Sequence, residues 1–590
     1  MIQQTQVYDY MVRSGTVQCR WNSVEKTLPI SIGMLPRKKE GELSAYSVLG
    51  SENGGLHVQV FMENDTGLQI EVLSFSMETT ILLPEKTQVF CNGYQSWSCS
   101  EMADVKKGFP IPPAYKPSLL KNSGDYRFSS YKRGLAHSWS YTYFNAPIGF
   151  TLLASLDESM AYTRFQFQYD AKKAGATVFV EKDCEGLTLP PVPRMSGTGT
   201  LPVKILDFFM TTGLEEDCFN RYFDLFYQVN KENGLFNRSL PALAWDSWYS
   251  LFDQVEENHL LSILKEYKVR EIPLDYFIIG QGYEKQVGDW MTPSDNFPGG
   301  LPRVVKEIKA AHYKAGLTFC PFICSGKSQL FLERPELIAK DKRGKLLKVG
   351  KIRGHGGDYY LIDLYNPQSI SYVKRCIKTI VEDWGISILK FDFLYAAGLH
   401  SGPYVKRTRA QAVHHALDLL RKFAGPVPVI ACGVPIGNAI GRFEYCSVAP
   451  DLSSGWDGSN PFFVGKNIRE RESTLGAIKS AIARRHLDSR AFSCDPGSFS
   501  LRKYKNNLSA REQESLFKTC IIFGGLISNS DSIGSYSADA LDLYRLAIAH
   551  RSTRSHDKNV LSVEKTPKAY NVQYVLRGEL HRDSISLSNK

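Results

Sequence analysis

The 590-residue sequence lacks the patterns that send a chain into or across a membrane. Its opening, MIQQTQVYDYMVRSGTVQCRW, contains no basic stretch followed by an apolar one. No later segment approaches the ~20 consecutive apolar residues that a membrane span needs. The sequence therefore predicts a chain that stays in the cytoplasm and has no membrane partner.

Paired cysteines and a dominant charge are also lacking. The 12 cysteines form no CxxC pair and no Cys/His grouping at zinc spacing, and several, such as Cys320 and Cys446, fall on runs that are typical of buried strands. We therefore expect reduced core thiols and no metal. The formal net charge of +10 is spread over a long chain in which acidic residues are interleaved with basic ones, so no nucleic-acid partner is indicated.

A chain of this length exceeds what one hydrophobic core supports, so two or three domains are expected. Apolar and polar residues alternate in short runs from about residue 15 to 210, for example LHVQVFM, LQIEVLSFSM and YTRFQFQY. This period of two, broken by turn residues, predicts an N-terminal β-sandwich over residues 1–213. Helical spacing in LEEDCFNRYFDLFYQVN then predicts a helical linker over residues 214–239.

From Pro241 the pattern changes to short apolar runs that alternate with amphipathic helical stretches, which is typical of a parallel sheet. The eight runs are ALAWDSW, DYFIIG, GLTFCPFI, SILKFDF, PVIACG, YCSVAP, RAFSCD and LISNSD. They predict a (β/α)8 TIM barrel over residues 240–536. A helix and a short β tail are expected over residues 537–590, so the predicted fold class is a multidomain chain.

Two aspartates follow strands of this barrel. Strand alternation points Lys390 and Asp392 to the same side, and Asp451 follows the sixth strand two positions further round. A carboxylate beside a lysine would stay ionised and could act as a nucleophile, whereas a second carboxyl in a drier pocket could act as an acid. The alternatives are a structural Lys–Asp ion pair for Asp392 and a helix-cap or turn residue for Asp451.

Two carboxyl groups at one barrel mouth are the minimal apparatus for cleaving a glycosidic bond. Aromatic residues that could stack on sugar rings collect in the loops after the same strands; any one tryptophan taken alone is more typical of a core, but six aromatics in three such loops favour a sugar site. They are Trp245, Trp248, Tyr249, Tyr283, Trp290 and Trp456.

The chain from about Leu240 to Ser530 resembles glycoside hydrolase family 36, the melibiase-type α-galactosidases. The strings that carry the resemblance are WDSWYS, GYEKQVGDW with NFPGGL, GLTFCPF, LKFDFLYAAG, ACGVPIGNAIG, VAPD and SCDPGS, with NGYQSW in the first domain. The resemblance implies that Asp392 is the nucleophile and Asp451 the general acid/base of a retaining double displacement. It implies no metal and no organic cofactor.

The resemblance also implies a set of sugar-pocket residues. These are Trp97, on a loop that reaches the barrel from the first domain, together with Trp245, Asp289, Trp290, Lys390 and Cys432. The partner that it implies is an oligosaccharide or small α-glycoside. Because family relatives often form oligomers, a homo-oligomer is an expectation that no residue pattern here locates.

The chain departs from the family pattern in three places, one of them a pair of residues. Gly280 and Gln281 stand where the family has an aspartate pair, Thr318 stands for a tryptophan, and Ser447 stands for an arginine. Because they lie at or near these departures in the predicted sugar site, we also count Gln281, Thr318, Ser447 and Trp456 among the candidate substrate contacts. The lost carboxylates should weaken binding of plain galactose, because each unpaired sugar hydroxyl costs ~1–3 kcal/mol.

These departures leave several functions open. An α-galactosidase with a changed glycone pocket leads, followed by an α-N-acetylgalactosaminidase or a hydrolase of another modified or anionic α-glycoside. The basic stretch KDKRGKLLKVGKIRGHGG (340–357) either is a solvated surface or serves an anionic substrate. A transglycosylase would use the same two aspartates, and a non-catalytic carbohydrate-binding protein is the alternative from another class.

Overall fold

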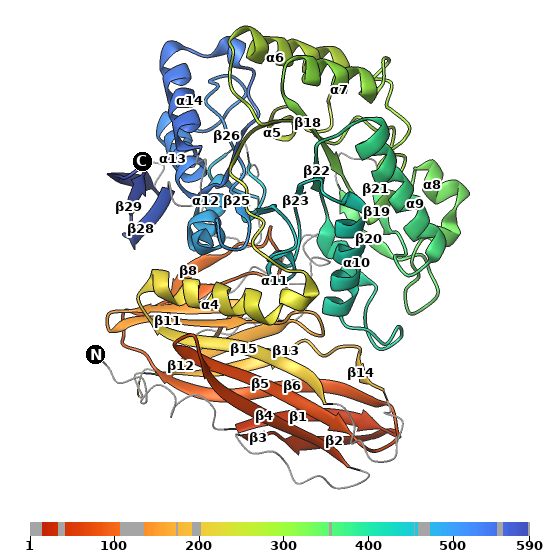
Figure 1. Cartoon of the computed structure of the whole chain (residues 1–590), viewed down its shortest axis with the longest axis vertical. Coiled ribbons are helices and arrows are strands. Elements are labelled where there is room, and N and C mark those ends of the chain that lie inside the picture. Colours follow the sequence, from red (N-terminus) through yellow and green to blue (C-terminus); the bar gives the residue numbers. More distant parts are fainter. Residues whose placement is uncertain are drawn as a thin grey trace.

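The computed structural model describes residues 14–32, 42–106, 135–170, 172, 175–190, 202–352, 357–453, 455–457, 472–551 and 558–587. Figure 1 shows two large bodies, a strand-rich one formed by the first third of the chain and a mixed one formed by the rest. Among the described residues, no helix combines the length and the apolar character needed to cross a membrane.

The strand-rich body consists of two sheets that share one apolar core, to which Val17, Val58, Leu153 and Phe165 belong. One sheet has the order β2 (Val24–Pro29), β1 (Ser14–Trp21), β6 (Ile70–Leu82), β13 (Gly175–Lys182), β12 (Thr163–Asp170) and β9 (Leu135–Trp139), with β14 (Leu187–Leu189) beside β6. The other has the order β3 (Ser31–Ile32), β4 (Leu43–Glu52), β5 (Gly55–Asn64), β15 (Val203–Gly213), β11 (Gly149–Ser155), β10 (Tyr141–Ala146), β7 (Gln88–Cys91) and β8 (Glu101–Asp104). The alternating burial along β1 follows the alternation of its sequence.

Helix α4 (Glu215–Val229) lies between the two bodies and is packed on both (Figure 1). Its aromatic residues at helical spacing, among them Phe219 and Tyr222, are buried, and the Tyr222 hydroxyl donates to the carbonyl of Ser155 on β11 at 2.8 Å. On the other side, Arg485 and Arg490 form ion pairs with Glu215 and Glu216. The segment expected to be a linker therefore begins with a structural layer, followed by the single turn η1 (Lys231–Asn233).

The second body is built on a parallel sheet that curls into a TIM-barrel arrangement. Its strand order is β25 (Ser493–Asp495), β24 (Tyr445–Ser447), β23 (Val429–Ala431), β22 (Ile388–Phe391), β18 (Lys314–Phe319), β17 (Tyr276–Ile279), β16 (Ala242–Asp246), β27 (Leu526–Asn529) and β26 (Ser498–Phe499). Each of the eight predicted runs contains one of these strands. The remaining strand, β26, lies outside the runs and follows β25 after only two residues. Because β25 pairs with β24 and β26 with β27, both ends of the sheet reach the same short segment.

Helices surround this sheet (Figure 1). They are α5 (Trp248–Leu251), α6 (Glu257–Val269), α7 (Leu301–Ala310), α8 (Gln329–Glu333), α9 (Pro367–Lys378), α10 (Arg409–Ala424), α11 (Ile436–Ala439), α12 (Thr474–Ala483), α13 (Ala510–Phe523) and α14 (Ala538–His550). Shorter turns are η2 (Pro335–Leu337), η3 (Thr379–Asp383), η4 (Leu394–Leu399), η6 (Arg485–Leu487) and η7 (Ile533–Ser535). Small three-stranded sheets are formed by β19 (Ile323–Ser325), β21 (Gly357–Leu361) and β20 (Lys348–Ile352), and by β28 (Lys558–Lys565), β29 (Ala569–Leu576) and β30 (Glu579–Ser586).

Alternation along the barrel strands separates two layers. Ala244, Ile278, Ile388 and Ile430 belong to a small interior cluster, whereas their neighbours in sequence belong to the large core that the helices cover. The interior is tight, because a Cβ at Gly316 would lie 2.7 Å from the side chain of Ile388. The interior positions at the carboxyl ends of the strands are polar, and they form the candidate site.

Candidate active site

Asp392 comes directly after β22, at the carboxyl end of the barrel. Its backbone amide donates to the carbonyl of Phe319 at 3.0 Å, and its Oδ1 accepts from the amide of Phe393 at 3.2 Å. Phe393 has a φ of +57°, a left-handed conformation that is costly for a bulky residue. The aspartate is therefore held by a turn whose strain the surrounding packing must offset.

Lys390 pairs with a different carboxylate from the one that the sequence suggested. Its Nζ donates to Asp246 Oδ2 at 2.7 Å, and both side chains are largely buried. Asp246 ends β16, so this ion pair crosses the barrel mouth. The charge of Lys390 lowers the pKa of Asp392 as expected, but burial outweighs it and raises that pKa to about 7.

Asp451 lies on the same side of the barrel, after β24. The Tyr249 hydroxyl donates to its Oδ1 at 3.1 Å. Burial raises the pKa of Asp451, while the Lys390 charge and the Tyr249 hydrogen bond lower it. The pKa of Asp392 is raised further by the nearby charge of Asp451, so the two carboxyls lie within electrostatic reach of each other.

Asp495 completes a set of four carboxyl groups that was not recognised as such in the sequence. Burial raises its pKa, Lys390 lowers it, and the charges of Asp246 and Asp451 raise it further. Both Asp246 and Asp495 end barrel strands, which was the available signal. Within the ranges that the structure describes, no three His, Cys, Asp or Glu side chains are grouped so that they could hold a metal ion.

Two of the expected sugar-stacking tryptophans lie in the core. Trp245 is fully buried, stacks on Phe277 with ring centroids 4.2 Å apart, and donates from Nε1 to the carbonyl of Asp531 at 3.0 Å. Trp290 is 1% exposed and packs on Phe319 at 4.5 Å. Because Trp245 and Asp246 are adjacent on a strand, only one of them can face the interior, and it is the aspartate.

Asp289 and Trp456 also have structural roles. Asp289 accepts from the backbone amides of Gln329 at 3.0 Å and Leu330 at 3.1 Å, so its carboxylate caps the start of α8. Trp456 is 6% exposed and belongs to the large core. Their geometry therefore supports neither as a sugar contact.

The remaining candidates lie at the ends of neighbouring barrel strands. Cys432 belongs to the interior cluster, and Thr318 lies opposite Lys390 in the β18–β22 pair. The Thr318 hydroxyl is buried and has no hydrogen-bond partner within the described part of the chain. Ser447 donates weakly to the carbonyl of Ala449 at 3.4 Å. A buried hydroxyl without a partner is costly unless a ligand supplies one.

Gln281 occupies one of the positions where the family resemblance implied an aspartate pair. Its Nε2 contacts Cys320 Sγ at 2.7 Å, and burial, together with the charge of Asp392, raises the pKa of that thiol. Next to it, the amide of Gly280 donates to Ser247 Oγ at 2.7 Å, the same distance at which a Cβ on Gly280 would meet that oxygen. The serine therefore fills space that a side chain at position 280 would need.

A loop from the strand-rich body forms part of the barrel mouth, as the resemblance implied. Trp97 meets Phe393 edge to face at 5.2 Å, packs on the interior cluster and lies close to Gly433. The loop is held by Ser96, whose amide donates to the carbonyl of Val434 at 2.7 Å. The aromatic ring next to the strained Phe393 thus comes from a segment nearly 300 residues away in sequence.

Arg484, at the end of α12, fastens this loop. The side chain is fully buried. It donates to Asn92 Oδ1 at 2.9 Å and to the carbonyls of Ser96 at 2.6 Å, Gln95 at 3.1 Å and Val448 at 3.0 Å. Val448 precedes Asp451 by three residues, so one guanidinium links the Trp97 loop to the segment that carries Asp451.

Comparisons with known proteins show what this chain is similar to in sequence and in fold. Residues 201–421 match the family model described as Melibiase, and this stretch contains Asp392 but ends before Asp451. An α-galactosidase from Escherichia coli is 22% identical over 195 residues, which cover 31% of this chain and 26% of that protein. The chain thus spans about a quarter of the length of this curated relative.

Solved structures extend the likeness to nearly the whole chain. An α-galactosidase from Thermus thermophilus in complex with p-nitrophenyl α-D-galactopyranoside is 20% identical with a TM-score of 0.67, and the match covers 96% of this chain and 98% of that one. A family 36 α-galactosidase from Geobacillus stearothermophilus is 11% identical with a TM-score of 0.59, covering 91% and 72%. At such identities the structural likeness shows a shared fold.

Proposed function

We propose that this chain, whose residues 201–421 form a melibiase domain, is a retaining α-glycoside hydrolase with Asp392 as nucleophile and Asp451 as general acid/base. The observation that carries the proposal is the pair of carboxyls at one barrel mouth, which follow β22 and β24 with β23 between them. Burial raises the pKa of both, and the charge of Asp451 reaches Asp392. A polar mouth lined by Lys390 and by the Thr318 hydroxyl, which finds no hydrogen-bond partner among the described residues, supports a ligand rich in hydroxyl groups.

In the first step, an Asp392 oxygen attacks the anomeric carbon, and the bond to the leaving oxygen breaks as Asp451 gives it a proton. This step yields a glycosyl ester on Asp392 and an ionised Asp451. In the second step, Asp451 takes a proton from water, the hydroxide oxygen attacks the anomeric carbon, and the ester bond to Asp392 breaks. Two inversions give net retention, and both carboxyls return to their starting protonation states.

The proton on each carboxyl must match its role. Asp392 has to be ionised to attack, and a pKa raised to about 7 means that it becomes fully ionised only above neutrality. Asp451 has to carry a proton, which burial favours. Because the two groups interact, the observed pH profile will report the pair.

Among glycones, an α-galactoside leads, since the relatives named above are α-galactosidases. The second candidate is an α-N-acetylgalactosaminide or another modified α-glycoside. Gly280, Gln281, Thr318 and Ser447 support it, because all four replace charged or bulky groups of the family pattern by neutral or smaller ones, and all but Gln281 also free volume. A screen of p-nitrophenyl α-glycosides tests the choice, and ordinary efficiency restricted to the galactoside would refute the changed pocket.

An anionic glycone is less favoured by the charges. The mouth holds four aspartates around one lysine, which already pairs with Asp246. In the basic stretch, Lys348 pairs with Asp358 at 2.7 Å on the surface. A substrate carboxylate would therefore enter a field of like charge.

A mechanism-based fluoro-glycoside separates the enzyme from a non-catalytic carbohydrate-binding protein, since only an active nucleophile forms the glycosyl ester. A transglycosylase would also be labelled, and product analysis with added sugar acceptors distinguishes it from a hydrolase. We further propose the division into residues 1–213, 214–239, 240–536 and 537–590. Fractionation would test the cytoplasmic location, and light scattering would test the homo-oligomer.

A further inference from the structure

We propose that Arg502 is a positioning residue, which holds Tyr249 in hydrogen-bonding contact with Asp451 and so tunes the group that acts as acid/base. The inference rests on the proposed function, because it assigns a control to the acid/base of that same site. It concerns residues outside the two catalytic aspartates and the sugar-pocket candidates.

Tyr249 is poorly fixed by its own helix. It lies on α5, a single turn of four residues directly after β16. The Trp248 amide at its start donates to Asp246 Oδ1 at 2.9 Å, but so short a helix has few internal hydrogen bonds. The side chain nevertheless has to keep its hydroxyl 3.1 Å from Asp451 Oδ1. A support from outside the helix is therefore needed.

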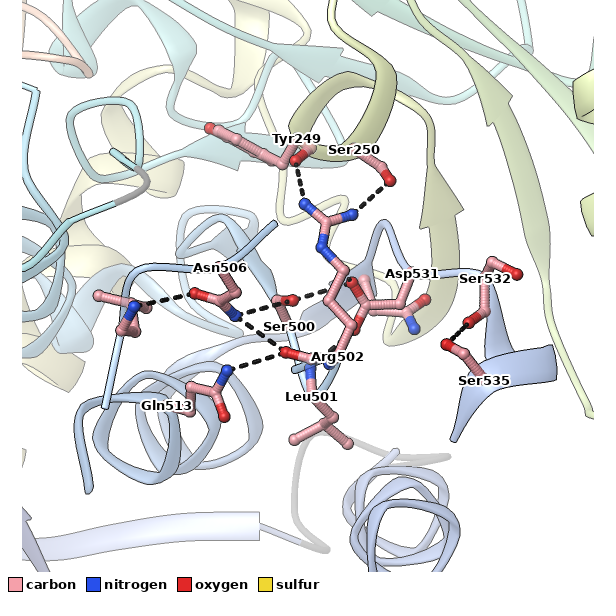
Figure 2. Close-up of polar contacts among 12 residues, drawn as sticks. Tyr249, Ser250, Ser500, Leu501, Arg502, Asn506, Gln513, Asp531, Ser532 and Ser535 are labelled. Carbon is pink, nitrogen blue, oxygen red and sulfur yellow. Dashed lines mark hydrogen bonds and ion pairs between the residues drawn. The ribbon is translucent and has the colours of Figure 1, made fainter. Parts of the chain in front are cut away.

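Arg502 supplies that support. Figure 2 shows its guanidinium extending from the loop after β26 to α5, where it reaches both Tyr249 and Ser250. Nη2 donates to the carbonyl of Tyr249 at 3.2 Å, and Nη1 donates to the hydroxyl of Ser250. A planar group with two bonds to successive residues fixes the orientation of the turn as well as its position.

Asp531 in turn fixes Arg502. This carboxylate is fully buried at the end of the β27 run, and it accepts from the amides of Leu501 at 2.7 Å and Arg502 at 3.1 Å. The Tyr536 hydroxyl donates to it at 2.7 Å, and the Arg502 Nε lies 3.6 Å from its Oδ1. Contacts thus run from Asp531 through Arg502 to Tyr249 (Figure 2). The Tyr249 hydroxyl continues them to Asp451.

The Tyr249 hydrogen bond has a defined electrostatic effect. It stabilises the ionised form of Asp451 and so lowers the pKa that burial raises. The charged or titratable groups that act around Asp451 are Lys390, Tyr249, Asp246, Asp392 and Asp495. Of these, within the described part of the chain, Tyr249 is the group that donates a hydrogen bond to Asp451, so losing this contact should raise the pKa of the acid/base.

The test compares Tyr249→Phe and Arg502→Gln with Arg490→Gln, a control whose arginine is also mostly buried but pairs with Glu216 on α4. Each purified full chain is assayed for kcat/KM against pH with an α-glycoside that the wild type cleaves and that has a poor leaving group, because only the departure of a poor leaving group needs the proton of Asp451. We expect the alkaline limb to move up by about 0.5–1 pH unit in Tyr249→Phe, and less but in the same direction in Arg502→Gln. The control should leave the limb in place.

A purely structural role for Arg502 would lower kcat or stability without moving the limb, and that result overturns the proposal. A crystal structure of Arg502→Gln gives a second readout that needs no activity. A Tyr249 hydroxyl displaced from Asp451 supports the proposal, and one retained at hydrogen-bond distance refutes it. Should Arg502→Gln not fold, Arg502→Lys is measured instead, because it keeps the charge but loses the two-pronged contact. Absence of any glycosidase activity would refute the proposed function, while the crystal readout still decides this inference.

Discussion

Replacing Arg484 by glutamine should loosen the barrel mouth without touching a catalytic group. The guanidinium satisfies four acceptors, three of them on the Trp97 loop and one next to the Asp451 segment. A glutamine amide can keep about one of them, and each buried acceptor left unpaired costs ~1–3 kcal/mol. Allowing for relaxation, we expect a loss of about 3–5 kcal/mol in the free energy of unfolding, which a domain of ordinary stability survives.

Substrate binding should weaken at the same time. With the loop released, Trp97 no longer forms a fixed wall of the site, and the loss of an aromatic contact of about 1–1.5 kcal/mol corresponds to a KM roughly tenfold higher. Urea unfolding and Michaelis kinetics measure the two effects, with Arg490→Gln as the control for removing a sheltered arginine. An unchanged KM in a variant that is clearly destabilised would refute the view that the loop contributes to the site.

The remaining predictions use the same two assays. Trp97→Ala should raise KM roughly tenfold with little change in stability, because its ring lies at the barrel mouth. Trp245→Phe should lower the free energy of unfolding by about 1–3 kcal/mol and leave KM unchanged, because its ring lies in the core. The opposite pattern would contradict these two positions. With a good leaving group, Asp451→Ala should spare the first step and slow the second; equal losses with good and poor leaving groups would count against its role. Since burial raises the folded-state pKa of Asp392 to about 7, from ~3.9 in the unfolded chain, this group stabilises the fold less as pH rises through that interval. Relative to the wild type, the free energy of unfolding of Asp392→Asn should therefore be higher at pH 8 than at pH 5 by on the order of 1–3 kcal/mol, measured by urea unfolding. The same difference at both pH values would contradict the burial of Asp392.

Local patterns predicted the elements of the barrel well. All eight apolar runs contain a strand of the curled sheet, because a strand buried on both faces leaves a continuous apolar signature. The same runs placed Asp392 and Asp451 at one end of the barrel, since the carboxyl ends of parallel strands lie together.

The sequence did not predict which residues far apart along the chain form ion pairs or hydrogen bonds with each other. Lys390 pairs with Asp246, 144 positions away, and nothing in either segment names the other. Arg484 and the Asn92–Trp97 loop meet in the same way. The orientation of Trp245 was available from alternation with Asp246 within one strand, but the aromatic content of the loops was given more weight than that alternation.

The central claim is tested most directly by treating the protein with an activated 2-deoxy-2-fluoro α-glycoside and sequencing the labelled peptide. The account predicts stoichiometric labelling of Asp392 in the wild type and none in Asp392→Asn. A label on another residue, or none with any glycone that the protein binds, would contradict it.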